Sequence, residues 1–181
     1  MGDIVRSKIT IFEMMKERGF HDVIEDNEKN MHFTNKHGEH LQVKFCDKSS
    51  GKILFFENMI ENDINLKDIK KKYKDINIYV VPFDIPLDST LYHSIRKMYN
   101  MKGIFIQFFS YENLYFNVTK HLLVPKHEII DEIQCGLHEY MNIKDLPKIF
   151  ISDPVAKFIG LRPNQVCKIH RPSGIYYRLC S

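Results

Sequence analysis

Residues 153–160 read Asp153-Pro154-Val155-Ala156-Lys157-Phe158-Ile159-Gly160, and this stretch contains the signals that begin and end a short helix. The Asp153 side chain can accept hydrogen bonds from the free amides of a first turn, and proline fits the first helical position. Gly160 can adopt the left-handed conformation that ends a helix. One face of this helix is apolar, with Val155, Phe158 and Ile159. Because so short a helix is unstable alone, we expect that face to pack beneath the hairpin that follows.

The last residues of the chain predict that hairpin, with its turn at residues 171–174, Arg-Pro-Ser-Gly. Strand alternation puts five side chains inward: Cys167, Ile169, Ile175, Tyr177 and Leu179. It puts four outward: Lys168, His170, Tyr176 and Arg178. The hairpin would then have one apolar face and one basic, aromatic face, which suits an acidic or hydrogen-bonding partner such as protein or nucleic acid. A solvated sheet face is the alternative interpretation.

Composition is that of an ordinary globular protein. The 181 residues are 44% hydrophobic and 27% charged, and a chain of this size buries roughly 70% of its unfolded surface. No apolar run is long enough to cross a bilayer, and the charged start MGDIVRSK does not resemble a signal peptide, so we expect no membrane contact and no export. The net charge of +3 is too small to indicate a free nucleic-acid binder. Four cysteines are interpreted as reduced, small apolar side chains: Cys46, Cys135, Cys167 and Cys180.

The first 120 residues predict a sheet with helices. An opening helix with the stripe Val5, Ile9, Phe12 and Met15 should end at Arg18-Gly19, and residues 26–40 have the composition of a loop. Strands are expected at 41–45, 53–56, 76–81, 104–108 and 114–118. A surface helix is expected around Leu66, Ile69 and Tyr73, and another, capped by Asp88, with Leu91, Ile95, Met98 and Tyr99 on one face.

Pro125 interrupts this pattern, and a new helical stripe follows it, made of Ile129, Ile130, Ile133, Leu137 and Met141. We therefore predict an α+β protein of two domains, 1–121 and 122–181. The first would be an α/β domain with a mixed sheet flanked by helices, and the second a small α+β domain.

The C-terminal part contains a series of short motifs: residues 123–127 (LVPKH), 146–149 (LPKI), 153–156 (DPVA), 160–161 (GL), 166–169 (VCKI), Arg171 and 177–178 (YR). In order and spacing these motifs strongly resemble the assembly domain of the fifth common subunit of eukaryotic RNA polymerases I, II and III, and its archaeal RNA polymerase counterpart is similar over the same stretch. Weaker likeness continues upstream through residues 16–19, 43–47, 78–81 and 117–119. The archaeal protein lacks the N-terminal jaw domain, so the chain resembles the eukaryotic type, or a copy of it in a large DNA virus.

The resemblance implies a non-catalytic subunit of a multisubunit DNA-directed RNA polymerase, active in transcription. Its C-terminal assembly domain would dock on the largest polymerase subunit beside other subunits, and its N-terminal jaw domain would extend towards downstream duplex DNA. The residues expected to bind the partner are Asp153, Pro154, Arg162, Lys168, Arg171, Tyr177 and Arg178, with Tyr177 as core support.

In the jaw, the family has a Thr-Pro-Ser-Ala type of loop near the DNA. The matching residues 85–89 here are Ile-Pro-Leu-Asp-Ser, and the acidic Asp88 would repel phosphate. The residues expected near DNA are Pro86, Ser89, His93, Arg96 and Lys97. Ordinary exposed positions on a helix are the alternative interpretation of the last four.

The sequence gives little support for a metal site or an enzyme active site. Two Cys-x-x-His units, 135–138 and 167–170, look like zinc ligands, but positions three apart in a strand point to opposite sides. His32, His37 and His40 with Cys46 are equally explained by a solvated loop. A nuclease would need a carboxylate where Gln42 precedes Val43-Lys44, and a neutral amide does not hold Mg²⁺ well. We therefore expect no enzyme activity, metal, cofactor or small-molecule substrate.

Two other functions remain open at this stage: a free-standing nucleic-acid-binding adaptor that uses the basic hairpin, and a Mg-dependent nuclease. The polymerase interpretation implies a nuclear protein if the owner is a cellular eukaryote. It implies a cytoplasmic and virion protein if the owner is a virus.

Overall fold

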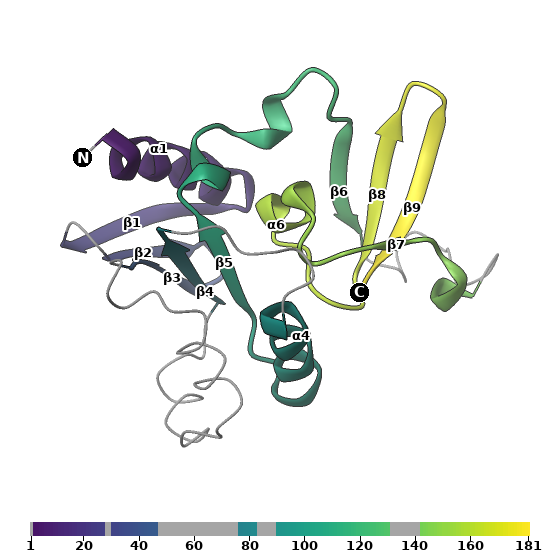
Figure 1. Ribbon diagram of the computed structural model, residues 1–181, viewed down its shortest axis with the longest axis horizontal. Helices are drawn as coiled ribbons and strands as arrows, with labels where there is room; N and C mark the ends of the chain where they lie inside the picture. Colours follow the sequence, from purple (N-terminus) through teal and green to yellow (C-terminus); the bar gives the residue numbers. More distant parts are fainter. Residues whose placement is uncertain (1, 28–29, 47–75, 83–89, 131–141) are drawn as a thin grey trace. The chain divides into compact units, whose positions relative to one another are not determined.

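The computed structural model describes residues 2–27, 30–46, 76–82, 90–130 and 142–181 (Figure 1). The chain divides into two compact units, Met1–Phe116 and Asn117–Ser181. The expected boundary was between residues 121 and 122. Both units combine helices with a sheet, so the fold class is α+β, as predicted.

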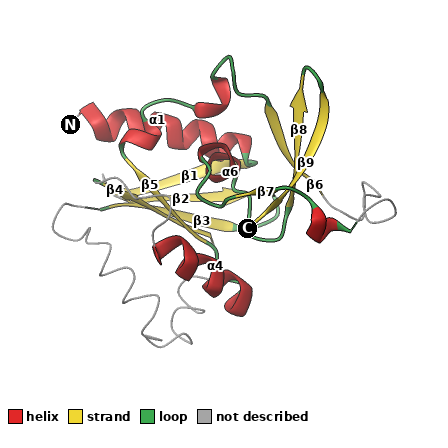
Figure 2. Ribbon diagram, turned by 45° about the vertical axis from the view of Figure 1, so that its right-hand side comes forward, coloured by secondary structure: helices red, strands yellow, loops and turns green. Residues whose placement is uncertain are grey.

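The first unit is built on a five-stranded mixed sheet. In chain order the elements are α1 (Gly2–Glu17), β1 (Phe20–Asn27), β2 (Asn30–Asn35), β3 (His40–Phe45), β4 (Ile76–Val81), α4 (Thr90–Lys102), β5 (Ile106–Ser110) and the short 3-10 helix η1 (Glu112–Leu114). The strand order is β1-β2-β3-β4-β5; β1, β2 and β3 pair antiparallel, and β3, β4 and β5 pair parallel. Figures 1 and 2 show α1 and α4 on opposite sides of this sheet, and every residue of β5 is buried.

Helix α1 forms as predicted, but with a different face buried. Ile11, Met14 and Met15 are fully buried beside the small polar Ser7 and Thr10, whereas Val5 and Ile9 are 58% and 57% exposed. Gly19, at φ 84°, ends the helix. The expected stripe was therefore wrong at Val5 and Ile9, because the sheet covers another apolar stripe of the helix. Met15 is buried as expected, and Phe12, although 38% exposed, has its ring 5.8 Å from that of the buried Phe33.

Two further differences concern strands. Residues 26–40, expected as a loop, contain β2, where Met31, Phe33 and Asn35 are buried and alternate with half-buried neighbours. The expected strand at 114–118 is instead a pair of 3-10 turns around the fully buried Leu114. The predicted strands at 41–45 and 76–81 and the buried face of α4, with Leu91, Ile95 and Met98, are confirmed. The expected strand at 53–56, the helix around Leu66, Ile69 and Tyr73, and Asp88 lie outside the described residues.

The second unit has a four-stranded sheet. Its elements are the 3-10 helix η2 (Val118–Lys120), β6 (Lys126–Ile130), the 3-10 helix η3 (Ile143–Asp145), β7 (Lys148–Ile149), α6 (Pro154–Ile159), β8 (Val166–Arg171) and β9 (Gly174–Cys180). The strand order is β6-β8-β9-β7, antiparallel except for the β7–β9 pair. Ile129 and Ile130 belong to a strand rather than to the expected helix, and Ile133, Leu137 and Met141 lie outside the described residues.

Among the described residues, no helix combines the length and the apolar character needed to cross a bilayer.

Candidate protein interface on the C-terminal hairpin

The helix signals at residues 153–160 produce the predicted structure. Asp153 accepts hydrogen bonds from the backbone amides of Val155 and Ala156, at 2.9 and 3.0 Å, and Pro154 occupies the first turn. Gly160 ends α6 in the left-handed conformation, with φ 76° and ψ 29°. Helix α6 contacts η2 and β6, the strand beside the hairpin strand β8. This arrangement commits the Asp153 carboxylate to capping and leaves Pro154 exposed.

A two-residue turn fixes the register of the hairpin. Arg171 pairs with Gly174, and the next pairs are His170 with Ile175, Ile169 with Tyr176, Lys168 with Tyr177 and Cys167 with Arg178. Directly paired residues of antiparallel strands have their side chains on the same face of the sheet. The Tyr177 face therefore has Val166, Lys168, His170, Ile175, Tyr177 and Leu179. The Arg178 face has Cys167, Ile169, Arg171, Tyr176 and Arg178.

This register overturns the prediction of one apolar face and one basic face. Side chains alternate along each strand as expected, but the residues of β8 and β9 that were predicted to point inward lie on opposite faces of the sheet. Each face therefore contains both apolar and basic side chains. Lys168 and Arg178 consequently lie on opposite faces of the sheet. Ile175, predicted to point inward, is 52% exposed beside the turn, beyond the apolar part of its face.

The apolar part of the Tyr177 face is a small core. Leu146, Val166 and Leu179 are buried together, and Ile130, Ile143 and Tyr177 pack against them. Lys168 is the direct cross-strand neighbour of both Tyr177 and Glu128. Tyr177 therefore lies between the apolar core of this unit and the charged residues Lys168 and Glu128.

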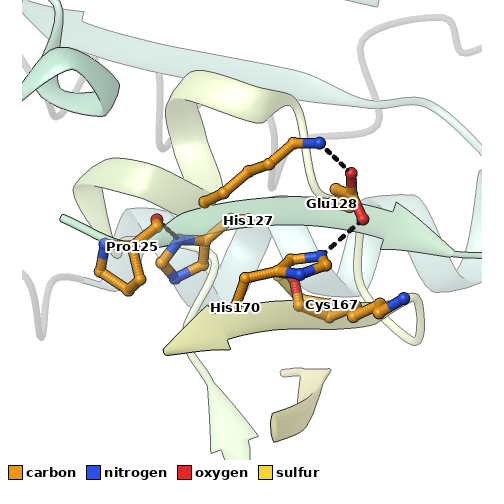
Figure 3. A network of polar contacts seen from close by, with 7 residues as sticks. Pro125, His127, Glu128, Cys167 and His170 are labelled. Atoms are coloured by element: carbon orange, nitrogen blue, oxygen red, sulfur yellow. Dashed lines mark hydrogen bonds and ion pairs between the residues drawn. The ribbon is translucent and has the colours of Figure 1, made fainter. Parts of the chain in front are cut away.

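A polar network extends this face onto β6 (Figure 3). The Glu128 carboxylate contacts the Lys126 ammonium and lies 2.8 Å from His170 Nε2. The hydrogen bond from Lys126, and then that from His170, lower the pKa of Glu128 from 4.5 to about 2. His127, which pairs with Ile169 and so lies on the other face, bonds through Nδ1 to the Pro125 carbonyl oxygen at 2.7 Å. Lys126 and Glu128 were not among the predicted site residues, because only the pairing of β6 with β8 brings them to His170.

The Arg178 face combines two arginines with buried thiols. Arg178 donates a 2.9 Å hydrogen bond to the carbonyl oxygen of Lys148, which ties β9 to β7. The Arg171 guanidinium lies 5.1 Å from the ring centre of Tyr176, whose hydroxyl is 3.0 Å from Ser173 Oγ. Burial raises the pKa of Cys167 to about 11 and that of Cys180 to about 12, so both stay protonated and behave as small apolar side chains.

The remaining predicted residues are spread over the two units. Arg162 is half-buried in the turn after α6, where its backbone amide donates to Gln165 Oε1 at 2.9 Å. His93, Arg96 and Lys97 all lie on the exposed side of α4. Pro86 and Ser89 lie outside the described residues.

The possible zinc ligands Cys167 and His170 are separated as predicted, on opposite faces of β8. Cys135 and His138 lie outside the described residues. Of the other histidines considered, His40 bonds to Thr34 Oγ1 through Nδ1 at 3.1 Å. The parts of the chain that the structure describes contain no group of three or more His, Cys, Asp or Glu side chains placed to hold a metal.

Comparison with known proteins defines the class of this unit. The family model described as "RNA polymerase Rpb5, C-terminal domain" matches residues 116–180, which is almost the whole second unit. The chain therefore belongs to the family of RNA polymerase subunit 5 proteins, whose C-terminal domain it contains.

Individual relatives agree with this assignment. The chain is 39% identical over 72 residues to DNA-directed RNA polymerase subunit Rpo5 of Archaeoglobus fulgidus, covering 95% of that protein but 35% of this chain. It is 38% identical over 87 residues to DNA-directed RNA polymerases I, II, and III subunit rpabc1 of Dictyostelium discoideum, covering 44% of each. The DNA-directed RNA polymerase subunit 5-like protein 1 of Arabidopsis thaliana is 24% identical over 93% of this chain and 88% of its own length.

Proposed function

We propose that this chain is a non-catalytic subunit of a multisubunit DNA-directed RNA polymerase. Two observations support this most: the chain matches 95% of the length of an archaeal protein that is named as a polymerase subunit, and the family model of the C-terminal domain matches residues 116–180. The weaker likeness to the plant protein extends over both units.

The second unit acts as the assembly domain and docks on the largest polymerase subunit. Its docking residues are those expected from the resemblance: Asp153, Pro154, Arg162, Lys168, Arg171, Tyr177 and Arg178. Because the pairing register places Lys168 on one face and Arg171 on the other, the partner contacts the hairpin from both sides. A partner surface of that kind holds the hairpin in a groove.

The first unit acts as the jaw, near downstream duplex DNA. The exposed side of α4, with His93, Arg96 and Lys97, offers donors to phosphate groups. The subunit works where its polymerase works, in the nucleus of a cellular eukaryote or in the cytoplasm and virion of a large DNA virus.

The register counts against a free-standing nucleic-acid adaptor. That function relied on one basic hairpin face, whereas Lys168 and Arg178 point to opposite sides of the sheet and cannot follow one phosphate backbone together. The nuclease alternative gains nothing from β3, where Gln42 stands in place of a carboxylate.

Gel filtration of a native extract tests the proposal. We expect the chain to elute with an assembly of several hundred kilodaltons; elution of all of it near its own 21.5 kDa would overturn the subunit assignment. The double substitution Lys168→Glu and Arg171→Glu should shift the chain to the monomer position, with its circular dichroism unchanged. Should the double variant stay in the assembly, the subunit assignment stands and the docking face is wrong.

A further inference from the structure

Glu128 is the only acidic residue in the strands β6, β8 and β9, and it lies within a group of basic ones. Lys126 pairs with His170, and Glu128 pairs with Lys168, across β6 and β8. Directly paired residues of antiparallel strands have their side chains on the same face, so all four lie on the Tyr177 face. Two neighbouring strands therefore bring three basic side chains and one carboxylate together.

The Glu128 carboxylate contacts two of these three basic side chains. It forms an ion pair with the Lys126 ammonium and lies 2.8 Å from His170 Nε2 (Figure 3). Because an ionised carboxylate only accepts hydrogen bonds, Nε2 must be the donor. The hydrogen bond from Lys126, followed by that from His170, holds the pKa of Glu128 at about 2, so the carboxylate is negative at neutral pH. Lys126 and His170 are thus already bound to an anion within the chain.

Lys168 differs from these two neighbours. It pairs with Glu128 on one side and with Tyr177 on the other, but the Glu128 carboxylate contacts other side chains. Within the described parts of the chain, the Lys168 ammonium has no hydrogen bond or ion pair. The Lys168 side chain is half-buried, and Tyr177 packs against the apolar core beside it. A partly desolvated ammonium of this kind is best matched by a single carboxylate that a protein partner brings.

Binding to nucleic acid would place a different demand on this face. The affinity for a nucleic acid rises with the number of phosphates that basic side chains neutralise, so several free cations along one surface are needed. Lys126 and Lys168 could supply them, with His170 when it is protonated, if no carboxylate held them. The Glu128 side chain is 35% exposed at this point, so its charge repels phosphate as well as occupying Lys126 and His170.

We propose that Glu128 selects the partner of the Tyr177 face: it keeps Lys126 and His170 from binding a phosphate chain, and it leaves Lys168 to bind a carboxylate of the protein partner. This inference rests on the proposed function and adds to it the chemistry of one docking contact. Glu128 is a positioning residue in this role, because it acts through the basic side chains around it. Excluding the wrong partner contributes to specificity in the same way as attracting the right one.

The first test measures how the purified full-length chain binds a fluorescently labelled DNA duplex. Glu128→Gln keeps the size of the side chain and its ability to accept hydrogen bonds, but it removes the charge. We expect this variant to bind the duplex at least about tenfold more tightly than the unaltered chain at low salt, because it releases up to two cations. The slope of the logarithm of the binding constant against the logarithm of the salt concentration should become steeper by about 1–2. A purely structural role for Glu128 would leave this slope unchanged.

Two further variants control for net charge and for folding. Asp145→Asn removes one negative charge from an exposed position of the same unit, in η3, and should leave DNA binding unchanged. Adding Lys126→Gln to Glu128→Gln should bring the affinity back towards that of the unaltered chain, since Lys126 is one of the released cations and its side chain is 71% exposed. The circular dichroism of all four proteins should be the same.

Either of two results would overturn the proposal. One is equal DNA affinity and salt dependence for the unaltered chain and Glu128→Gln, and the other is an equal gain of affinity in Asp145→Asn. This measurement uses no polymerase, so it tests Glu128 separately from the proposed function. If the unaltered chain recovers no polymerase subunit from its host, the proposed function fails and the carboxylate contact of Lys168 falls with it.

The second test identifies the group that Lys168 contacts in the assembled polymerase. A water-soluble carbodiimide joins a lysine ammonium to a neighbouring carboxylate as an amide, and the carbodiimide takes up the lost water to become a urea. We expect Lys168 to be joined to an aspartate or glutamate of another polymerase subunit, whereas the unassembled chain, treated in the same way, should give no such product. If Lys168 in the assembled complex were joined only to Glu128, or to no carboxylate, the proposal would be contradicted.

Discussion

Asp153 shows how one side chain positions an element of the second unit. Its carboxylate bonds to two of the free amides of α6, and the helix that it caps is only six residues long. Ala156 and Phe158 of that helix are almost fully buried. Loss of the cap would therefore affect the packing of the unit as well as the helix itself.

The cap gives a direct prediction for stability. Asp153→Ala should lower the free energy of unfolding by about 1 kcal/mol, because two amides lose their partner. Asp153→Asn should retain most of the stabilisation that the cap contributes, because its side-chain oxygen can still accept from these amides. Urea unfolding followed by tyrosine fluorescence measures both variants. An Asp153→Ala variant as stable as the unaltered chain would show that the cap contributes nothing.

Glu128 gives a prediction about pH. Its pKa is about 2 in the folded chain and 4.5 ordinarily, so its ion pairs stabilise the fold fully above about pH 4.5. That stabilisation is lost as the pH falls from about 4.5 towards 2. Because the group is solvent-accessible, salt should weaken the effect.

The variant Glu128→Gln removes the titrating group. Its free energy of unfolding should fall less steeply between pH 4.5 and 2 than that of the unaltered chain. Urea unfolding at a series of pH values, at low and high salt, makes the comparison. Equal slopes for the two proteins would mean that the contacts with Lys126 and His170 do not stabilise the fold.

At the scale of elements, local signals were sufficient for α6 and insufficient for the hairpin. Capping residues act within a few positions of sequence, so the start and end of α6 could be predicted. Which side chains of a hairpin share a face of the sheet also depends on which residues pair across the turn. Alternation predicted which side chains within each strand share a face. The pairing of Arg171 with Gly174, however, puts the side chains of β8 that were predicted to point inward on the opposite face from those of β9.

Elements that depend on contacts distant in sequence were also hard to predict. Strand β2 is surrounded by polar residues, and its Met31 and Phe33 are recognisable as a buried face only once β3 pairs with it. Glu128 and His170 are 42 positions apart and meet only through the sheet. The wrong prediction for α1 has the same cause, because the sheet decides which of the two apolar stripes of the helix is buried.

The buried face of α1 can be tested with two matched variants. Ile11→Ala should lower the free energy of unfolding by about 2–4 kcal/mol, because Ile11 is fully buried. Ile9→Ala should change it by less than about 0.5 kcal/mol, because Ile9 is 57% exposed on the same helix. Urea unfolding of both variants measures the difference. A larger loss for Ile9→Ala than for Ile11→Ala would restore the originally expected stripe.

At the scale of the whole molecule, the two units are proposed to have different partners, protein for the second and DNA for the first. Arg96 and Lys97 lie on the exposed side of α4, and they offer the test of the DNA role. Replacing both by alanine in the assembled polymerase should weaken binding to downstream duplex DNA. The slope of the logarithm of the binding constant against the logarithm of the salt concentration should become less steep by about 2 if each residue contacts one phosphate.

DNA binding by the polymerase at a series of salt concentrations measures that slope. Lys144→Ala is a suitable control, since Lys144 is an exposed lysine of the other unit, and its slope should be unchanged. A slope unchanged in the Arg96 and Lys97 variant would mean that α4 does not contact phosphate.

The central claim is that this chain enters a polymerase through its second unit. Mass spectrometry of the proteins bound to a tagged full-length copy, purified from its own host, tests it most directly. We predict that the largest polymerase subunit is among the most abundant proteins recovered with the unaltered chain, and that it is lost with Lys168→Glu and Arg171→Glu. Recovery of the tagged chain without any polymerase subunit would contradict the claim.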